Sequence, residues 1–66
     1  MANYKIVILD GSKQTHLTFR EKDHARALDR FRWDTEVYRV PGTMFWFFKD
    51  GELLSMDAVK YYDIGD

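Results

Sequence analysis

The sequence has no cysteine, a single proline and four isolated glycines, and these scarcities exclude several classes of protein. Without cysteine there are no disulfides and no thiolate metal ligands, which favours a reducing compartment such as the cytoplasm. The glycines form no phosphate-binding loop. No window reaches the roughly 20 apolar residues of a membrane helix, and the apolar run Ile6 to Leu9 is too short for a secretion signal. We therefore expect a soluble cytoplasmic protein that does not associate with membranes.

The chain also lacks an excess of either charge, since its 66 residues have a net charge of −1. This balance argues against a polybasic nucleic-acid binder and against an acidic mimic of nucleic acid. Residues 20–39 are rich in arginine but nearly neutral, whereas residues 49–66 carry two basic and five acidic residues. The uneven distribution suits the electrostatic steering of a partner.

Catalytic motifs are missing as well. The two histidines, His16 and His24, fall on different predicted elements and have no spacing typical of metal ligands. Ser12 and Ser55 lie in predicted breaks of the chain, and no motif places a base beside them. We therefore expect no enzymatic activity, no metal site and no cofactor.

Aromatic residues, by contrast, are abundant at 17% of the chain. A chain of 66 residues has room for one domain, 1–66, and buries only about 60% of the surface that its unfolded form exposes. Its stability must come from an unusually aromatic core or from burial against a second chain. Both explanations stay open at this stage.

Turn residues divide the chain into short elements. Residues 4–10 and 14–20 predict two strands joined at Asp10-Gly11, a strong hairpin signal. Apolar residues at helical spacing (His24, Ala27, Leu28, Phe31) predict an amphipathic helix near residues 21–33. Thr18 and Glu21 have the spacing of a capping box, but accepting it would shorten the second strand, so the start of the helix stays open by one turn.

The second half of the chain predicts further strands. "TEVYRV" at 35–40 predicts a third strand, Pro41-Gly42 a type II turn and "TMFWFFK" at 43–49 a fourth strand. After Asp50-Gly51, Leu53-Leu54 and residues 59–64 predict one interrupted strand or two short ones, with 55–58 as the interruption. The order β-β-α-β-β(-β) predicts an α+β domain with one helix packed on a mainly antiparallel sheet of four or five strands, either open or curled toward a small barrel.

The stretch "GTMFWFFKDG" at 42–51 is apolar on both sides of its predicted strand. Strand alternation directs Phe45 and Phe47 to one side, and Met44, Trp46 and Phe48 to the other. In the first predicted strand, Ile6 and Ile8 are opposed to Val7 and Leu9 in the same way. One short helix covers only one of these sides, so the second is covered by a curled sheet, by another copy of the chain, or by a ligand or partner. Burial within the chain or in a homodimer is the commoner fate of such rings.

Two sets of residues are candidates for binding a protein partner. The first is the aromatic sheet face with Met44, Trp46, Phe48 and Tyr38, and the second is a helix face on which Arg26, Arg30 and Trp33 recur at i, i+4 and i+7. For the arginines the alternative is a solvated face, with Arg26 near Asp29 and Arg30 near Asp34. These residues favour a non-catalytic protein-interaction module, such as an inhibitor or accessory protein.

Single-stranded nucleic-acid binding is the alternative function. Trp46, Phe48 and Tyr38 would stack bases on the sheet while lysine or arginine met the phosphates. The net charge and the lack of basic residues between Val40 and Phe48 argue against it. In size and composition the chain is similar to many accessory proteins of phages and other mobile elements, and this resemblance implies a host protein as the partner.

Overall fold

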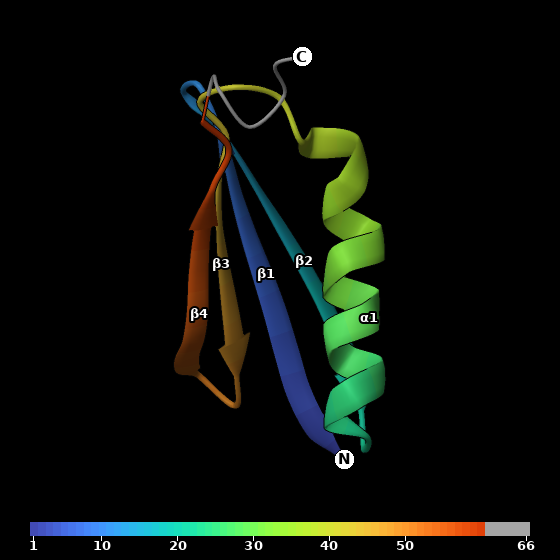
Figure 1. The fold of residues 1–66 in the computed structure, drawn as a ribbon. Coiled ribbons are helices and arrows are strands. Elements are labelled where there is room, and N and C mark those ends of the chain that lie inside the picture. Colours follow the sequence, from blue (N-terminus) through green and yellow to red (C-terminus); the bar gives the residue numbers. More distant parts are fainter. Residues whose placement is uncertain (61–66) are drawn as a thin grey trace.

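The computed structural model describes residues 1–60. The elements are β1 (Ala2–Asp10), β2 (Lys13–Glu21), α1 (His24–Thr35), the 3-10 helix η1 (Glu36–Tyr38), β3 (Met44–Lys49) and β4 (Glu52–Ala58). The four strands form one antiparallel sheet in the order β2-β1-β3-β4, and α1 lies along one face of it (Figure 1). The predicted α+β fold is confirmed. Within the described residues the sheet is open, because β2 and β4 are its two edges.

Both predicted hairpins form at their Asp-Gly pairs. Gly11 has a φ of 64°, and the β1–β2 pairing runs without interruption from Ala2 opposite Glu21 to Asp10 opposite Lys13. At the β3–β4 turn Asp50 and Gly51 both have positive φ, 49° and 83°, as a tight hairpin of right-handed twist requires. The Asp50 carboxylate also accepts a hydrogen bond of 2.9 Å from the Asn3 backbone N–H, which ties this turn to β1.

The core lies between α1 and the sheet. Tyr4, Ile6 and Ile8 of β1 and Phe45 and Phe47 of β3 are at most 2% exposed. The Phe47 ring stacks on Phe31 of α1 at a centroid distance of 4.6 Å, and on Tyr4 at 5.4 Å. Large stacked rings give this short chain much of its buried apolar area.

The helix begins and ends later than its sequence pattern predicts. Asp23 is the N-cap, since its side chain accepts a 2.9 Å hydrogen bond from the Ala25 N–H. The Thr18 and Glu21 capping box is wrong, because Thr18 lies within β2 opposite Lys5. Aspartate is as good an N-cap as threonine or better, and the longer β2 keeps its pairing with β1.

The predicted strand at 35–40 is wrong. Thr35 ends α1, where its hydroxyl donates a 2.7 Å hydrogen bond to the Phe31 carbonyl, and Glu36–Tyr38 form η1. The β-branched residues favoured a strand, but the helical hydrogen bonds continue through them, and Val37 is left 81% exposed. Gly42, with a φ of 90°, then turns the chain toward β3.

The last strand is more regular than predicted. β4 runs through residues 55–58, the expected interruption, and its only irregularity is a shift in register that places Phe47 opposite Ser55 and Phe48 opposite Leu53. Leu54 is the extra residue of this bulge. Of the strand predicted at 59–64, Val59 is buried just after β4 ends, and 61–64 lie outside the described residues.

Replacing Asp23 by alanine tests the observed start of the helix. The Ala25 N–H would lose its acceptor, and we expect the free energy of unfolding to fall by about 1 kcal/mol. Urea denaturation measures this change, with Asp29→Ala, at an exposed position inside α1, as the control. Equal effects of the two substitutions would contradict a cap at Asp23.

Candidate binding face

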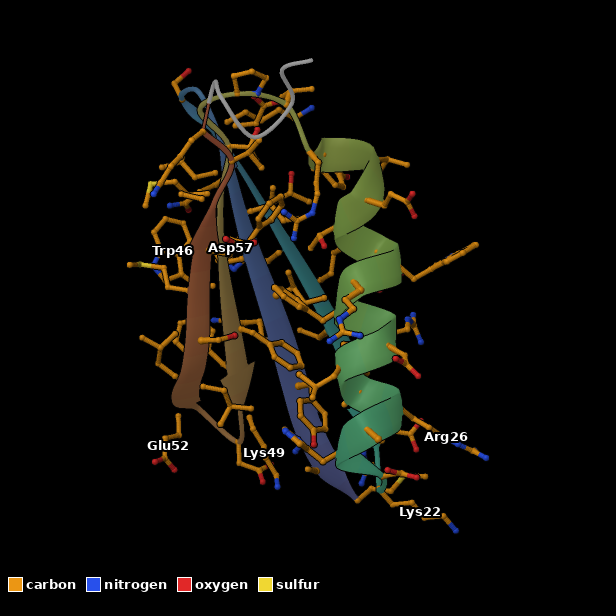
Figure 2. All side chains as sticks on the ribbon, in the orientation of Figure 1. Lys22, Arg26, Trp46, Lys49, Glu52 and Asp57 are labelled. Carbon is orange, nitrogen blue, oxygen red and sulfur yellow. The ribbon has the colours of Figure 1, made fainter. Side chains whose placement is uncertain are left out.

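One face of the sheet is left uncovered by the described residues. We call it the open face; its apolar residues are Val7, Leu9, Met44, Trp46, Phe48, Leu53 and Met56, and its polar residues are Asn3, Lys5, Gln14, His16, Thr18 and Arg20. The register places all of these on the side opposite α1. Val7 lies between Trp46 and the neighbouring β2 strand, and Trp46 lies opposite Met56 of β4. Figure 2 shows Trp46 pointing away from α1.

Burial differs sharply between the two sides of β3. Phe45 and Phe47 are 0% exposed beneath α1, whereas Met44, Trp46 and Phe48 are only half-buried. On the adjacent edge strand, Leu53 is 51% and Met56 60% exposed. The predicted two-sided apolar strand is thus confirmed, with its second side lacking a cover among residues 1–60.

Two hollows lie on the open face and share Phe48. The smaller, of about 250 Å³, is lined by Val7, Gln14, Trp46 and Phe48. The larger is a groove of about 540 Å³ beside the β3–β4 turn, and its lining includes Asn3, Lys5, Thr18, Arg20 and Phe48. One hollow is therefore mainly apolar, while the other brings two cations and two neutral polar side chains beside an aromatic ring.

The charges of the sheet are separated between its faces. The Lys5 Nζ lies 5.4 Å from the Phe48 ring centroid, a cation–π contact on the open face. Asp57 of β4 is on the helix side, where its carboxylate pairs with Arg39 at 2.9 Å. Asp50, at the turn beside the groove, has one carboxylate oxygen engaged by the Asn3 N–H. The open face is therefore cationic at one end, although the whole chain has a net charge of −1.

Tyr38 does not lie with Trp46 and Phe48. It belongs to η1, is half-buried and packs against the core cluster between α1 and the sheet. The expectation that it joins the aromatic platform is wrong, because it depended on a strand at 35–40 that does not form.

Arg26, Arg30 and Trp33 belong to α1, which lies on the opposite face of the sheet from Trp46, and Figure 2 shows Arg26 on that side. Trp33 is 76% exposed. Arg30 pairs with Asp34 at 3.0 Å, and its guanidinium carbon lies 5.0 Å from the Phe19 ring centroid. The solvated ion pair predicted for Arg30 is therefore present, and the structure does not join this helix face to the open face.

The histidines have separate, local contacts. His24 Nδ1 is 3.3 Å from the Tyr4 hydroxyl at the boundary of the helix stripe, and His16 Nε2 is 3.3 Å from Gln14 Oε1 on β2. Among residues 1–60, no group of three or more His, Cys, Asp or Glu side chains is arranged to hold a metal ion. The same residues contain no helix of the length and apolar character that would cross a membrane.

The sequence patterns did not single out Lys5 and Arg20, the two cations of this face. Each lies on a strand with a clear two-residue alternation, but their proximity arises from the β1–β2 pairing, which places Lys5 opposite Thr18 and Asn3 opposite Arg20. The proximity of Lys5 and Arg20 could therefore have been predicted by combining the alternation of the two strands with the hairpin at Asp10-Gly11.

Comparisons with known proteins do not identify a function for the open face. Comparisons of the chain with protein-family models, with curated proteins and with solved structures each find no match.

Proposed function

We propose that this protein is a non-catalytic module that captures a protein partner through its open face. The observation that carries the proposal is the half-buried row of Met44, Trp46 and Phe48 on a sheet face that no described element covers. A contiguous apolar surface of this kind is costly in water and commonly marks an interaction site. Tryptophan at its centre is among the residues that most often dominate binding energy.

The strands that carry the open face are held rigidly, which favours partner binding. Its side chains project from paired strands held by a dense aromatic core on the other side, so little side-chain and backbone freedom remains to be lost on binding. A small domain that covers a surface of its partner acts by occlusion. An inhibitor or accessory protein of the phage or mobile-element type, acting on a host protein in the cytoplasm, is consistent with this mode and with the composition of the chain.

A second copy of the chain is another occupant that the same face would accept. Two copies related by a two-fold axis would bury each Trp46 against the other open face. The solution mass, measured over a range of protein concentrations, distinguishes this outcome: a dimer that Trp46→Ser dissociates would identify the partner as the chain itself.

Single-stranded nucleic acid is supported by one specific observation, the presence of Lys5 and Arg20 in the groove lined by Phe48, whose ring also lines the hollow at Trp46. Two features weigh against it. Tyr38 is missing from the platform, and both cations lie at one end of the face, whereas a bound strand carries phosphates along its length. We therefore place it second.

Selection from a displayed library of random short peptides tests the proposal directly. We expect the wild-type protein to enrich a family of related peptides, and we expect Trp46→Ser to lose them. Trp33→Ser, at the exposed position on the outer side of α1, is the matched control and should retain them.

Two results would contradict the proposal. One is that no peptide is enriched and that the wild-type protein stays monomeric at high concentration. The other is that peptides are enriched but depend on Trp33 and not on Trp46, which would move the binding site to α1.

A further inference from the structure

Given the proposed function, the geometry points to the chemistry of the partner. We infer that the open face binds an extended protein segment in which an apolar side chain and a carboxylate stand two residues apart. The apolar side chain enters the hollow beside Trp46, and the carboxylate enters the groove between Lys5 and Arg20. The inference follows from the two hollows, their spacing and the sign of the charge at one end.

The groove offers donors from two neighbouring strands. Lys5 from the central strand β1 and Arg20 from the edge strand β2 contribute the cations, and Thr18 and Asn3 contribute neutral polar groups. Phe48 forms an apolar wall. A carboxylate is matched to this set because both cations donate hydrogen bonds that strengthen with an ionised acceptor.

The neighbouring hollow has fewer polar groups in its lining. Val7, Trp46 and Phe48 supply three apolar walls, and Gln14 supplies one polar edge. A leucine- or phenylalanine-sized side chain entering it would remove the half-buried Trp46 ring from water. Such a buried aromatic anchor within a pocket is the usual arrangement of an interface hot spot.

The spacing of the two hollows selects an extended segment. Lys5 and Val7 are two residues apart on the same face of β1, which corresponds to about 7 Å along a strand. Side chains i and i+2 of an extended peptide have this same separation and point to the same side. An apolar residue and an acidic residue at these positions therefore reach both hollows together.

The distribution of carboxylates favours an acidic occupant. By register Asp57 lies on the helix side, and Arg39 engages it there, so it does not compete for Lys5. Asp50 is not among the residues that line the groove, although its neighbour Gly51 is, and its carboxylate accepts from the Asn3 N–H. Two cations at one end, with polar side chains along β2 and apolar side chains on β3 and β4, match one carboxylate followed by apolar residues better than they match a chain of phosphates.

Synthetic probes test this inference without a known partner. Trp33→Phe leaves Trp46 as the sole tryptophan, so its fluorescence reports on the open face. Into this variant we would titrate a short peptide that repeats Leu-Ser-Glu-Ser, so that leucine and glutamate stand two residues apart on one side of the extended chain, together with its counterpart that has glutamine in place of glutamate, and oligothymidylate. We expect the glutamate peptide to bind about tenfold more tightly than the glutamine peptide at low salt, and the difference to shrink as salt is raised.

Substitution of the two cations provides the residue-level test. Lys5→Gln and Arg20→Gln are each expected to weaken binding of the glutamate peptide by about threefold and to leave the glutamine peptide unaffected. Arg26→Gln, which removes an equal charge from α1, is the control and should change neither affinity.

The outcomes separate this inference from the proposed function. Equal binding of both peptides, weakened by Trp46→Ser but not by the two cation substitutions when measured by isothermal titration calorimetry, would overturn the acidic preference and leave the binding face intact. Binding of neither peptide, with tight salt-dependent binding of oligothymidylate, would overturn both and favour the nucleic-acid alternative. Binding of no probe, in a variant whose circular dichroism is native, would also overturn the inference.

Discussion

Phe47→Ala is expected to unfold the domain. The Phe47 ring is 0% exposed and stacks on rings from α1 and β1, so its removal leaves a cavity that three aromatic neighbours cannot fill. Truncation of a buried phenylalanine costs about 3–5 kcal/mol. A core in a chain of this size seldom supplies more than about 3–5 kcal/mol in total. Circular dichroism and urea denaturation should therefore show a largely unfolded variant at room temperature.

The adjacent residue gives the matched control. Trp46→Ser removes an even larger side chain, but from the open face, and we expect the free energy of unfolding to change by about 1 kcal/mol or less. The two substitutions thus differ in outcome because neighbouring residues of β3 point to opposite sides of the sheet. A folded Phe47→Ala variant or an unfolded Trp46→Ser variant would contradict the assignment of the two faces.

Trp46→Ser is also expected to have the largest effect on binding. Truncation of a central interface tryptophan commonly costs 2 kcal/mol or more, which is about a thirtyfold loss of affinity. The loss should appear with any ligand that the selection yields, measured by isothermal titration calorimetry. Its cause would be lost contact area, because the variant keeps its fold.

Met44→Ala serves as a graded comparison on the same strand. Met44 lies opposite Leu9, at the other end of the open face from the basic groove, and it lines neither hollow. We expect its replacement to weaken binding by less than Trp46→Ser does. A larger effect at Met44 would mean that the ligand lies over the β1–β2 hairpin end of the face and not over the two hollows.

Local patterns were sufficient for most of the fold. Alternation along residues 44–48 predicted that Phe45 and Phe47 lie on the opposite side of the strand from Met44, Trp46 and Phe48, because side chains alternate along a strand. The Asp-Gly pairs predicted both hairpins, because these residues tolerate positive φ. The apolar spacing of Ala27, Leu28 and Phe31 predicted the side of the helix that packs on the sheet.

Features that depend on competition between elements were not predicted. Residues 35–40 have the composition of a strand, but the helix before them continues, and the chain needs a turn at that point to bring β3 beside β1. The groove at Lys5 and Arg20 required the pairing of two strands and the position of the β3–β4 turn, which no single segment encodes. Tyr38 was predicted on the open face but packs against the core, because residues 36–38 form η1 and not a strand.

The most direct test of the open face as a binding surface is a side-chain NMR titration with the leucine–glutamate peptide. Ile6 and Val7 are adjacent in β1 but point to opposite sides of the sheet, so their methyl groups report separately on the two faces. We expect the signals of Val7, Met44 and Met56 to shift while those of Ile6 and Ala27 stay in place. Shifts confined to α1, or equal shifts on both faces, would contradict binding at the open face.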